Sequence, residues 1–315
     1  MKKLKATFLL VMILLLSSSI IYAQQAVKKN KKAPPKRITV DTRVDNMAYW
    51  KNMARLGLVP VTPEMRVEPA TYTGSKIKAK SVLFDDSPDV PLTTVNSTQS
   101  ENSVFVDPND KNHALNSNNS TQNPVGSLYG ANDFFTFDGG ETWGGEVQGA
   151  GGGNSGDPTT AISNTGRMYV GYISNNSGQG ISYSTNGGQT WTAKQVAPNP
   201  GSMLDKNHLW IDNSTSSPYD GRLYDAWTAF GGPNNNQIEV SHSSDGGLTW
   251  STGVNVSAAV NAGSHNQGVN LHTGPNGEVY AIWAIYDSWP SDETAIGFAK
   301  SMDGGVTFGP AHRIV

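Results

Sequence analysis

The sequence predicts an all-β fold of many short strands, and its glycine content, its low charge and an internal repeat support this. The chain has 315 residues, of which 34 are glycine and only 16% are charged, against about 25% charged in an average soluble protein. This composition disfavours helical bundles and favours strands joined by turns. The chain has no cysteine, which excludes disulfide scaffolds, cysteine-ligated metals and thiol nucleophiles.

Residues 1–23 have the pattern of an export signal peptide. Lys2, Lys3 and Lys5 precede an apolar run at residues 8–16, and Ala23 suits a cleavage site. The uninterrupted run is short for a membrane anchor, the alternative interpretation. We therefore expect a protein that is secreted, periplasmic or held at the cell surface, with no transmembrane segment after cleavage.

Charge separates residues 24–100 from the main domain expected at residues 101–315. Residues 24–80 carry 13 basic and 4 acidic residues, whereas residues 81–315 carry 7 basic and 22 acidic ones. The acidic main domain disfavours nucleic-acid binding. The basic run at residues 28–37 is typical of a solvated linker, with an electrostatic tether as the alternative. Apolar spacing predicts a short helix at residues 46–57, followed by one strand at residues 81–84.

One turn motif occurs four times: Asp or Asn, two glycines, any residue, Thr and an aromatic. We call these segments the Gly-Gly turns. A short Asp or Asn side chain accepts hydrogen bonds from nearby backbone N–H groups, and paired glycines permit positive φ. Thr begins the next strand, and we expect the aromatic ring to be buried between sheets. These roles are structural for Asp138, Asn186, Asp245 and Asp303, and for Trp143, Trp191, Trp250 and Phe308.

A second repeated element precedes each of the last three turns. It is a strand-like run that contains Tyr169, Tyr224 or Tyr280, which are 55 and 56 residues apart. Further apolar runs flank it on both sides. Each repeat therefore contains four antiparallel strands in 50–60 residues, which is the size of a propeller blade.

The Gly-Gly turns resemble the Asp box, or bacterial neuraminidase repeat, of the sialidase superfamily of β-propellers. The resemblance covers residues 101–315 and implies six blades, whereas this chain supplies about four, so we expect an incomplete propeller. A compact four-bladed ring is the alternative. The resemblance also implies a glycan or glycoconjugate ligand. The protein is then either a glycoside hydrolase of exo-sialidase type or a noncatalytic recognition or scaffold propeller.

Propeller geometry predicts which residues share a face. The first and third turns of each blade lie on one face, and the second turns and the links between blades lie on the other, which we call the ligand face. Asp157 and Asp205 are candidate catalytic carboxylates there, although a buried charge network is the alternative role for Asp205. The other candidates are Lys206, His265, Asn266, Gln267, Tyr286, Asp287 and Trp289, and Trp289 either stacks on a sugar or covers a blade edge.

The arginines argue against a complete sialidase site. The resemblance implies three arginines around the sialate carboxylate, a tyrosine nucleophile paired with a glutamate, and an aspartate acid/base. Arg167 and Arg222 lie in first turns, away from the ligand face, and Arg313 lies in an outer strand. The Arg-Ile-Pro segment expected near the start of such a propeller is not found. We therefore expect no hydrolysis of sialosides.

Metal sites are weakly indicated. Residues 107–110 and 287–293 offer oxygen ligands that suit calcium, although the first segment is more simply a turn. The six histidines have no zinc spacing. We expect no cofactor, with calcium as the alternative.

Overall fold

The computed structural model describes residues 40, 53–59, 78–79, 82–83, 90–94, 98–123, 127–147, 150, 154–260, 263–289 and 292–314. The chain divides into two units, Met1–Thr42 and Arg43–Val315. The predicted signal peptide and basic linker lie outside the described residues. Within the predicted helix, residues 53–55 are helical. In the described part of the chain, no helix is long and apolar enough to span a membrane.

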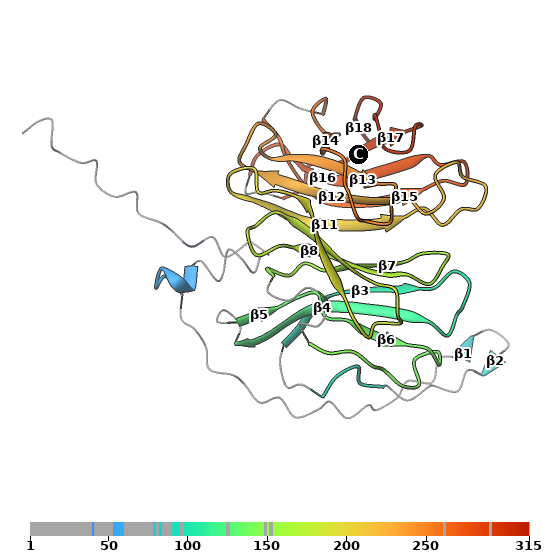
Figure 1. Cartoon of the computed structure of the whole chain (residues 1–315). Helices are drawn as coiled ribbons and strands as arrows, with labels where there is room; N and C mark the ends of the chain where they lie inside the picture. Colours follow the sequence, from blue (N-terminus) through green and yellow to red (C-terminus); the bar gives the residue numbers. More distant parts are fainter. Residues whose placement is uncertain are drawn as a thin grey trace, which may run out of the picture. The chain divides into compact units, whose positions relative to one another are not determined.

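The second unit contains a small hairpin and four larger antiparallel sheets (Figure 1). The hairpin pairs β1 (Lys78–Ala79) with β2 (Val82–Leu83), which falls within the strand predicted at residues 81–84. Blades 1 and 2 consist of β3 (Thr98–Val106), β4 (Ala114–Asn123), β5 (Ser127–Tyr129), β6 (Phe134–Thr136), β7 (Thr159–Ile162), β8 (Met168–Ile173), β9 (Gln179–Ser184) and β10 (Thr192–Ala197). Blades 3 and 4 consist of β11 (Met203–Ile211), β12 (Leu223–Phe230), β13 (Gln237–Ser243), β14 (Val254–Asn255), β15 (His265–Thr273), β16 (Val279–Tyr286), β17 (Ala295–Ser301) and β18 (His312–Arg313).

The order of strands confirms the predicted blade. In blades 2 to 4 the strands lie side by side in chain order. Blade 1 differs, because β5 and β6 both pair with β4 and share the third position. The first strands β3, β7, β11 and β15 contact one another in sequence, so they are the innermost strands of a β-propeller.

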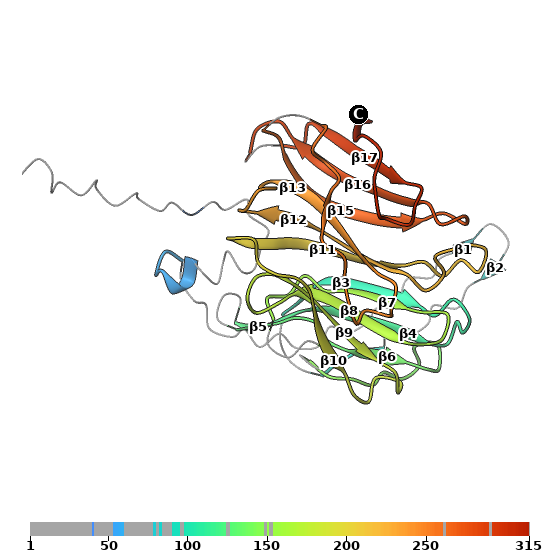
Figure 2. The same ribbon diagram turned by 45° about the horizontal axis from the view of Figure 1, so that its top comes forward.

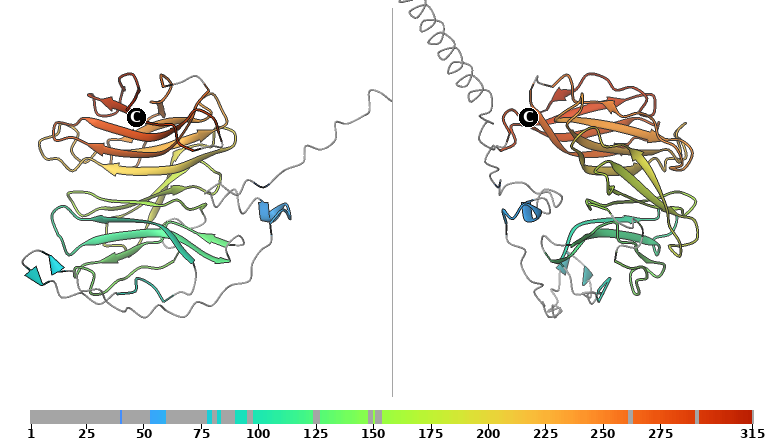
Figure 3. Two further views of the ribbon diagram at one scale, coloured as in Figure 1. Left: turned by 180° about the vertical axis from the view of Figure 1, so that it is seen from behind. Right: turned by 60° about the vertical axis from the view of Figure 1, so that its left-hand side comes forward.

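The blades follow one another in chain order, from blade 1 in green to blade 4 in orange and red (Figures 1 and 2). The view from behind shows the same order (Figure 3). Val104 on β3 is 63% exposed, and Ile282 on β16 and Ile296 on β17 are also exposed. Because these apolar sheet faces are uncovered, the four blades do not form a compact closed ring. The expectation of six blades stays a prediction.

The hydrophobic core lies between successive blades. One cluster joins Tyr224 and Val240 of blade 3 to Leu271 and Ala281 of blade 4. A similar cluster joins blades 2 and 3. Each sheet therefore buries side chains against both neighbours, as the apolar runs of every repeat predict.

The Gly-Gly turns have the predicted hydrogen bonds. All eight of their glycines have positive φ. In the first turn, Thr142 N–H donates to Asp138 Oδ1 at 2.9 Å, and the other three turns repeat this bond. The turn is further closed by the preceding hydroxyl: Ser243 Oγ donates to Asp245 Oδ1 and accepts from Gly247 N–H. These contacts give the turn residues a structural role.

The predicted packing of the turn aromatics between sheets is confirmed for Trp191, Trp250 and Phe308, which contact the core clusters between blades, but full burial is not. Trp143, Trp191, Trp250 and Phe308 are only half-buried. Two of these indoles fold back on their own turns, since Trp143 Nε1–H donates to Gly140 O and Trp250 Nε1–H donates to Gly247 O. The largest fully buried rings are Trp227 and Trp283, on the second strands of blades 3 and 4.

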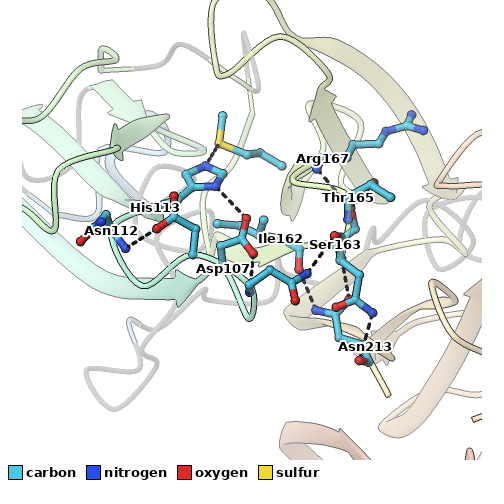
Figure 4. Close-up of polar contacts among 12 residues, drawn as sticks. Asp107, Asn112, His113, Ile162, Ser163, Thr165, Arg167 and Asn213 are labelled. Carbon is cyan, nitrogen blue, oxygen red and sulfur yellow. Dashed lines mark hydrogen bonds and ion pairs between the residues drawn. The ribbon is translucent and has the colours of Figure 1, made fainter. Parts of the chain in front are cut away.

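The first turns form a polar seam on the face that carries the Gly-Gly turns (Figure 4). His113 Nδ1 lies 3.0 Å from Asp107 Oδ2, and its Nε2 lies 3.2 Å from Met168 Sδ of blade 2. Asn213 of blade 3 donates to Ile162 O of blade 2 at 2.8 Å. The carboxylate of Asp107 also accepts from the backbone of its own turn, which supports the turn interpretation of residues 107–110. The seam therefore joins blades 1, 2 and 3.

Arg167 and Arg222 lie on the predicted face, away from the ligand face. The guanidinium of Arg167 stacks over Tyr183 at 3.8 Å. Arg222 lies over Tyr219 and donates to Gly304 O of the next blade at 2.7 Å. Both side chains therefore stabilise blades rather than face a ligand.

Candidate functional site

Each blade has one residue with positive φ at an equivalent position, within the innermost strand of blades 1, 3 and 4 and just before β7 in blade 2. These residues are Glu101 (φ 55°), Asp157 (φ 54°), Lys206 (φ 52°) and Gly268 (φ 70°). The strand pairing identifies the position, because the register shifts there in blades 1, 3 and 4. A left-handed backbone costs a non-glycine residue about 1–2 kcal/mol. Three blades keep a charged side chain there despite this strain, which is a feature typical of functional sites.

These side chains meet in what we call the axial network: Glu101, Asn119, Asp157, Asp205 and Lys206. Lys206 Nζ lies 2.9 Å from Glu101 Oε1. Asn119 Nδ2 donates to Glu101 Oε2 at 2.9 Å, and Asn119 Oδ1 accepts from Asp157 N–H at 2.9 Å. Blades 1, 2 and 3 therefore contribute to one polar cluster at the inner strands.

The surroundings of Asp157 favour its protonated form. Burial, together with the charge of Asp205, raises its pKa well above the ordinary value. No N–H or hydroxyl donor among the described residues reaches its carboxyl oxygens, but Glu101 is hydrogen-bonded to it. A hydrogen bond between two carboxyl groups requires a proton, and the group with the higher pKa holds it.

The surroundings of Glu101 favour its ionised form. Burial acts to raise its pKa, but the hydrogen bond from Asp157 and the charge of Lys206 outweigh burial and hold the pKa below its ordinary value. Burial raises the pKa of Asp205 to about 7, against the opposing charge of Lys206. Environments that separate the pKa values of neighbouring carboxyls are typical of acid/base pairs.

A chain of hydrogen bonds connects the axial network to blade 4. Gln267 Nε2 donates to Asp205 Oδ2 at 2.9 Å. Since the amide oxygen of Gln267 can only accept, His265 Nε2 donates to it, at 2.8 Å. The predicted residues Asp157, Asp205, Lys206, Gln267 and His265 thus lie together on the ligand face.

Burial changes the roles that these residues can have. Asp157 is 4% exposed and Asp205 is as deeply buried, whereas the side chains of Glu101 and Lys206 are 23% and 29% exposed. Asp157 and Asp205 therefore lie beneath Glu101 and Lys206, which are the charged groups within reach of a ligand. The sequence places Glu101 on this face, but we predicted no role for it.

The remaining candidates divide between the core and an exposed hairpin. Asn266 is fully buried, and its Oδ1 accepts from Trp283 Nε1–H at 2.8 Å, so the contacts of its side chain are structural. The hairpin between β16 and β17 carries the others. Arg313 holds Asp287 through two bonds of 2.7 and 2.9 Å, which occupy its carboxylate.

The hairpin also carries a group of aromatic side chains. Trp289 stacks on the ring of His265 with centroids 4.0 Å apart. Tyr286 meets Trp289 edge-on at 4.9 Å, and its hydroxyl donates to Glu293 Oε1 at 2.7 Å. Burial and the neighbouring Glu293 raise the pKa of Tyr286 to about 12. Among the described residues, no group of three or more His, Cys, Asp or Glu side chains could hold a metal ion.

Comparisons with known proteins reveal a shared fold. No family model matches the sequence, and no curated protein matches it. A protein of unknown function from Dyadobacter fermentans has 18% identity and a TM-score of 0.51, over 69% of this chain and 69% of that chain. The α-L-arabinofuranosidase Arb93A of Fusarium graminearum has 14% identity and a TM-score of 0.49, over 69% of this chain and 66% of that chain. The α-L-arabinanase of Penicillium chrysogenum has 12% identity and a TM-score of 0.49, over 69% of this chain and 67% of that chain. At 18% identity, the first likeness concerns the fold alone.

Asp225 on β12 is a further buried carboxyl that sequence reasoning missed. It occupies the position that Val170 has in blade 2 and Ala281 has in blade 4. Burial raises its pKa from 3.8 to about 8. Between these values the folded protein holds one more proton than the unfolded chain, so the free energy of unfolding falls as pH rises.

We expect Asp225→Asn to reduce the pH dependence of stability between about pH 4 and pH 8. Asparagine has a similar shape and does not ionise, so a slope of up to about 1.4 kcal/mol per pH unit is removed. Urea unfolding at pH 5, 7 and 9 measures this against wild type, with the exposed Asp110→Asn as control. Because Asp157 and Asp205 also titrate, the decisive quantity is the difference in slope. An unchanged slope in Asp225→Asn contradicts the prediction.

Proposed function

We propose that this chain is a glycan-acting propeller of the sialidase superfamily, exported by its signal peptide, which binds and hydrolyses neutral glycosides at the axial network. The observation that carries the proposal is the pairing of ionised Glu101 with protonated Asp157 on strained backbone at the inner strands. Strained backbone together with separated pKa values indicates a functional site.

The charges around the network favour a neutral ligand. A sialate carboxylate is best held by the two-pronged guanidinium of arginine. Arg167 and Arg222 stabilise the opposite face, and Arg313 is paired with Asp287. Lys206 is the cation of the network, and it is paired with Glu101. An anionic sugar would therefore meet carboxylates without a matching arginine cluster.

The chain's own groups offer an acid for glycoside hydrolysis. Asp157 can pass its proton to Glu101, the more exposed carboxyl, which then protonates the glycosidic oxygen of the leaving group. The resemblance to sialidases implies a tyrosine nucleophile paired with a glutamate, and Tyr286 and Glu293 form such a hydrogen-bonded pair. Because Tyr286 packs against Trp289, away from Glu101, this pair does not act on the bond that Glu101 protonates. Water would instead attack the anomeric carbon, and its proton would return to the Glu101–Asp157 pair.

A second candidate function is noncatalytic glycan recognition. Two acid/base carboxyls of a glycosidase are normally about 5–10 Å apart, with the sugar between them. Glu101 and Asp157 are instead in direct contact, and Asp157 and Asp205 are buried. In this alternative the network positions Glu101 and Lys206 as hydrogen-bonding groups for sugar hydroxyls.

The test is a panel of fluorogenic glycosides offered to the full chain: arabinofuranoside, galactoside, glucoside, xyloside and sialoside. We expect turnover of a neutral substrate and none of the sialoside. Glu101→Gln should lower kcat about 100-fold or more, because it removes the proton donor. The matched control is Glu141→Gln, an exposed glutamate in a Gly-Gly turn. Saturable glycan binding without turnover would favour the recognition propeller, and turnover of the sialoside would contradict the neutral-ligand proposal.

A further inference from the structure

We propose that Trp289, supported by His265 and Tyr286, is an aromatic subsite that binds one sugar ring of a neutral oligosaccharide while the adjoining unit reaches the axial network. This inference rests on the proposed glycan ligand but not on hydrolysis. It names the form of the ligand, a neutral oligosaccharide rather than a monosaccharide or an anionic sugar.

Trp289 is both exposed and held in place. The residue is 42% exposed although one face of its indole stacks on His265 at an interplanar angle of 27°. Tyr286 packs against it at nearly a right angle, with an interplanar angle of 84°. A large aromatic ring that is fixed before binding loses little conformational entropy when a ligand stacks on it. The accessible indole surface is therefore a preformed binding platform.

The support beneath Trp289 is rigidly connected to the axial network. His265 is buried, and its ring also contacts Phe230 of blade 3 at 5.4 Å. The bonds from His265 to Gln267 and from Gln267 to Asp205 fix the platform relative to the carboxyls. His265 Nδ1 is buried and has no hydrogen-bond partner among the described residues. A buried ring nitrogen without a hydrogen bond costs free energy, and packing alone does not explain why an imidazole stands beneath an exposed indole.

The hairpin that presents Trp289 is braced at both sides. Arg313 of β18 holds Asp287 through two hydrogen bonds. Thr294 Oγ1 accepts from Asp287 N–H at 3.1 Å and donates to Ile285 O at 3.0 Å. Only one face of the Trp289 indole is needed to cover His265. The contacts that hold the hairpin therefore also fix the position of the other, exposed face of the indole.

The surrounding charges select the kind of sugar. Asp287, Asp292 and Glu293 lie in the hairpin, and Arg313 is the cation paired with it. Carboxylates accept hydrogen bonds from sugar hydroxyls but repel an acidic sugar. The C–H face of a neutral sugar ring suits the apolar indole.

The side chains that lie between Trp289 and the axial network imply a ligand of more than one sugar unit. Successive contacts run from Trp289 through the imidazole of His265 and the amide of Gln267 to the carboxyl of Asp205. We therefore expect a single ring stacked on the indole to stop short of Glu101, and an adjoining unit to reach it. Oligosaccharides should bind more tightly than their own monosaccharides.

Isothermal titration of the full chain with xylotetraose, arabinotetraose, cellotetraose and galactotetraose, with each monosaccharide and with sialyllactose, tests the subsite. We expect one neutral tetrasaccharide to bind at least about tenfold more tightly than its monosaccharide. Trp289→Ala should weaken tetrasaccharide binding about tenfold, and Trp289→Phe should restore most of the loss. The matched control is Leu248→Ala, which shortens an exposed apolar side chain on the opposite face.

The outcomes separate this inference from the proposed function. Unchanged tetrasaccharide affinity in Trp289→Ala, with turnover still lost in Glu101→Gln, overturns the subsite and leaves the hydrolase. Weakened binding in Trp289→Ala, in a wild-type protein that hydrolyses nothing, supports the subsite and contradicts hydrolysis. Preference for sialyllactose, or equal affinity for tetrasaccharide and monosaccharide, also overturns the subsite.

Discussion

Trp283→Ala is expected to lower the free energy of unfolding by about 3–5 kcal/mol. Trp283 is among the largest fully buried side chains and belongs to the core cluster between blades 3 and 4. Its indole lies directly over Gly297 of β17, where a Cβ atom would come within 2.2 Å of the ring. The truncation leaves a cavity and also removes the hydrogen-bond donor of the buried Asn266.

Urea unfolding at pH 7 measures this loss. Trp283→Phe is the internal control, because it keeps an aromatic ring but removes the indole N–H, and it should lose clearly less stability. Trp289→Ala provides the surface comparison, since that indole is already half in solvent. Equal losses in Trp283→Ala and Trp289→Ala would show that burial at blade 4 does not stabilise the fold as described.

Gly188→Ala is expected to destabilise the protein more than Gly247→Ala, although both change the second glycine of a Gly-Gly turn. The two backbones have φ of +82° and +85°, so the strain of a left-handed alanine is the same. A Cβ at Gly188 would lie 2.4 Å from the ring of Phe135, whereas the nearest atom to a Cβ at Gly247 is 3.4 Å away. We expect losses of about 1–2 kcal/mol for Gly247→Ala and about 2–4 kcal/mol for Gly188→Ala.

The free energies of unfolding of the two variants are compared with wild type in the same titration. Because both glycines have nearly the same φ, the cost of backbone strain cancels when the two losses of unfolding free energy are subtracted. The remaining difference is due to the steric contact with Phe135 of blade 1. Gly188→Ala combined with Phe135→Leu should recover part of the loss, since the smaller side chain yields space. A Gly247→Ala variant as unstable as Gly188→Ala would mean that backbone strain, not packing against Phe135, determines the requirement for glycine.

The fold could be predicted because its signals are local. Asp138, its two glycines and Thr142 lie within five residues, and their hydrogen bonds depend only on that segment. Four such segments divide the chain into blades before any tertiary contact is known. The burial of the turn aromatics could not be predicted in this way, because it depends on how neighbouring blades pack.

The candidate site was only partly predictable because its register is set between strands. The distance from the positive-φ residue to the next Gly-Gly turn ranges from 29 residues for Asp157 to 39 for Lys206. Loops of different lengths therefore conceal that Glu101, Asp157 and Lys206 are equivalent. Nor does sequence reveal that Asn266 turns inward to Trp283, because Asn266 and the ligand-facing Gln267 are neighbours on one strand.

The shared left-handed position of the inner strands separates the chemistry of the site from the architecture that holds it. A glutamate, an aspartate, a lysine and a glycine all occupy the same backbone position, and in every blade the second strand pairs with the first in antiparallel register. Each blade thus offers one interchangeable side chain to the centre. Substitutions at four codons could diversify the ligand preference of such a propeller during evolution while its hydrogen-bonded sheets stay the same.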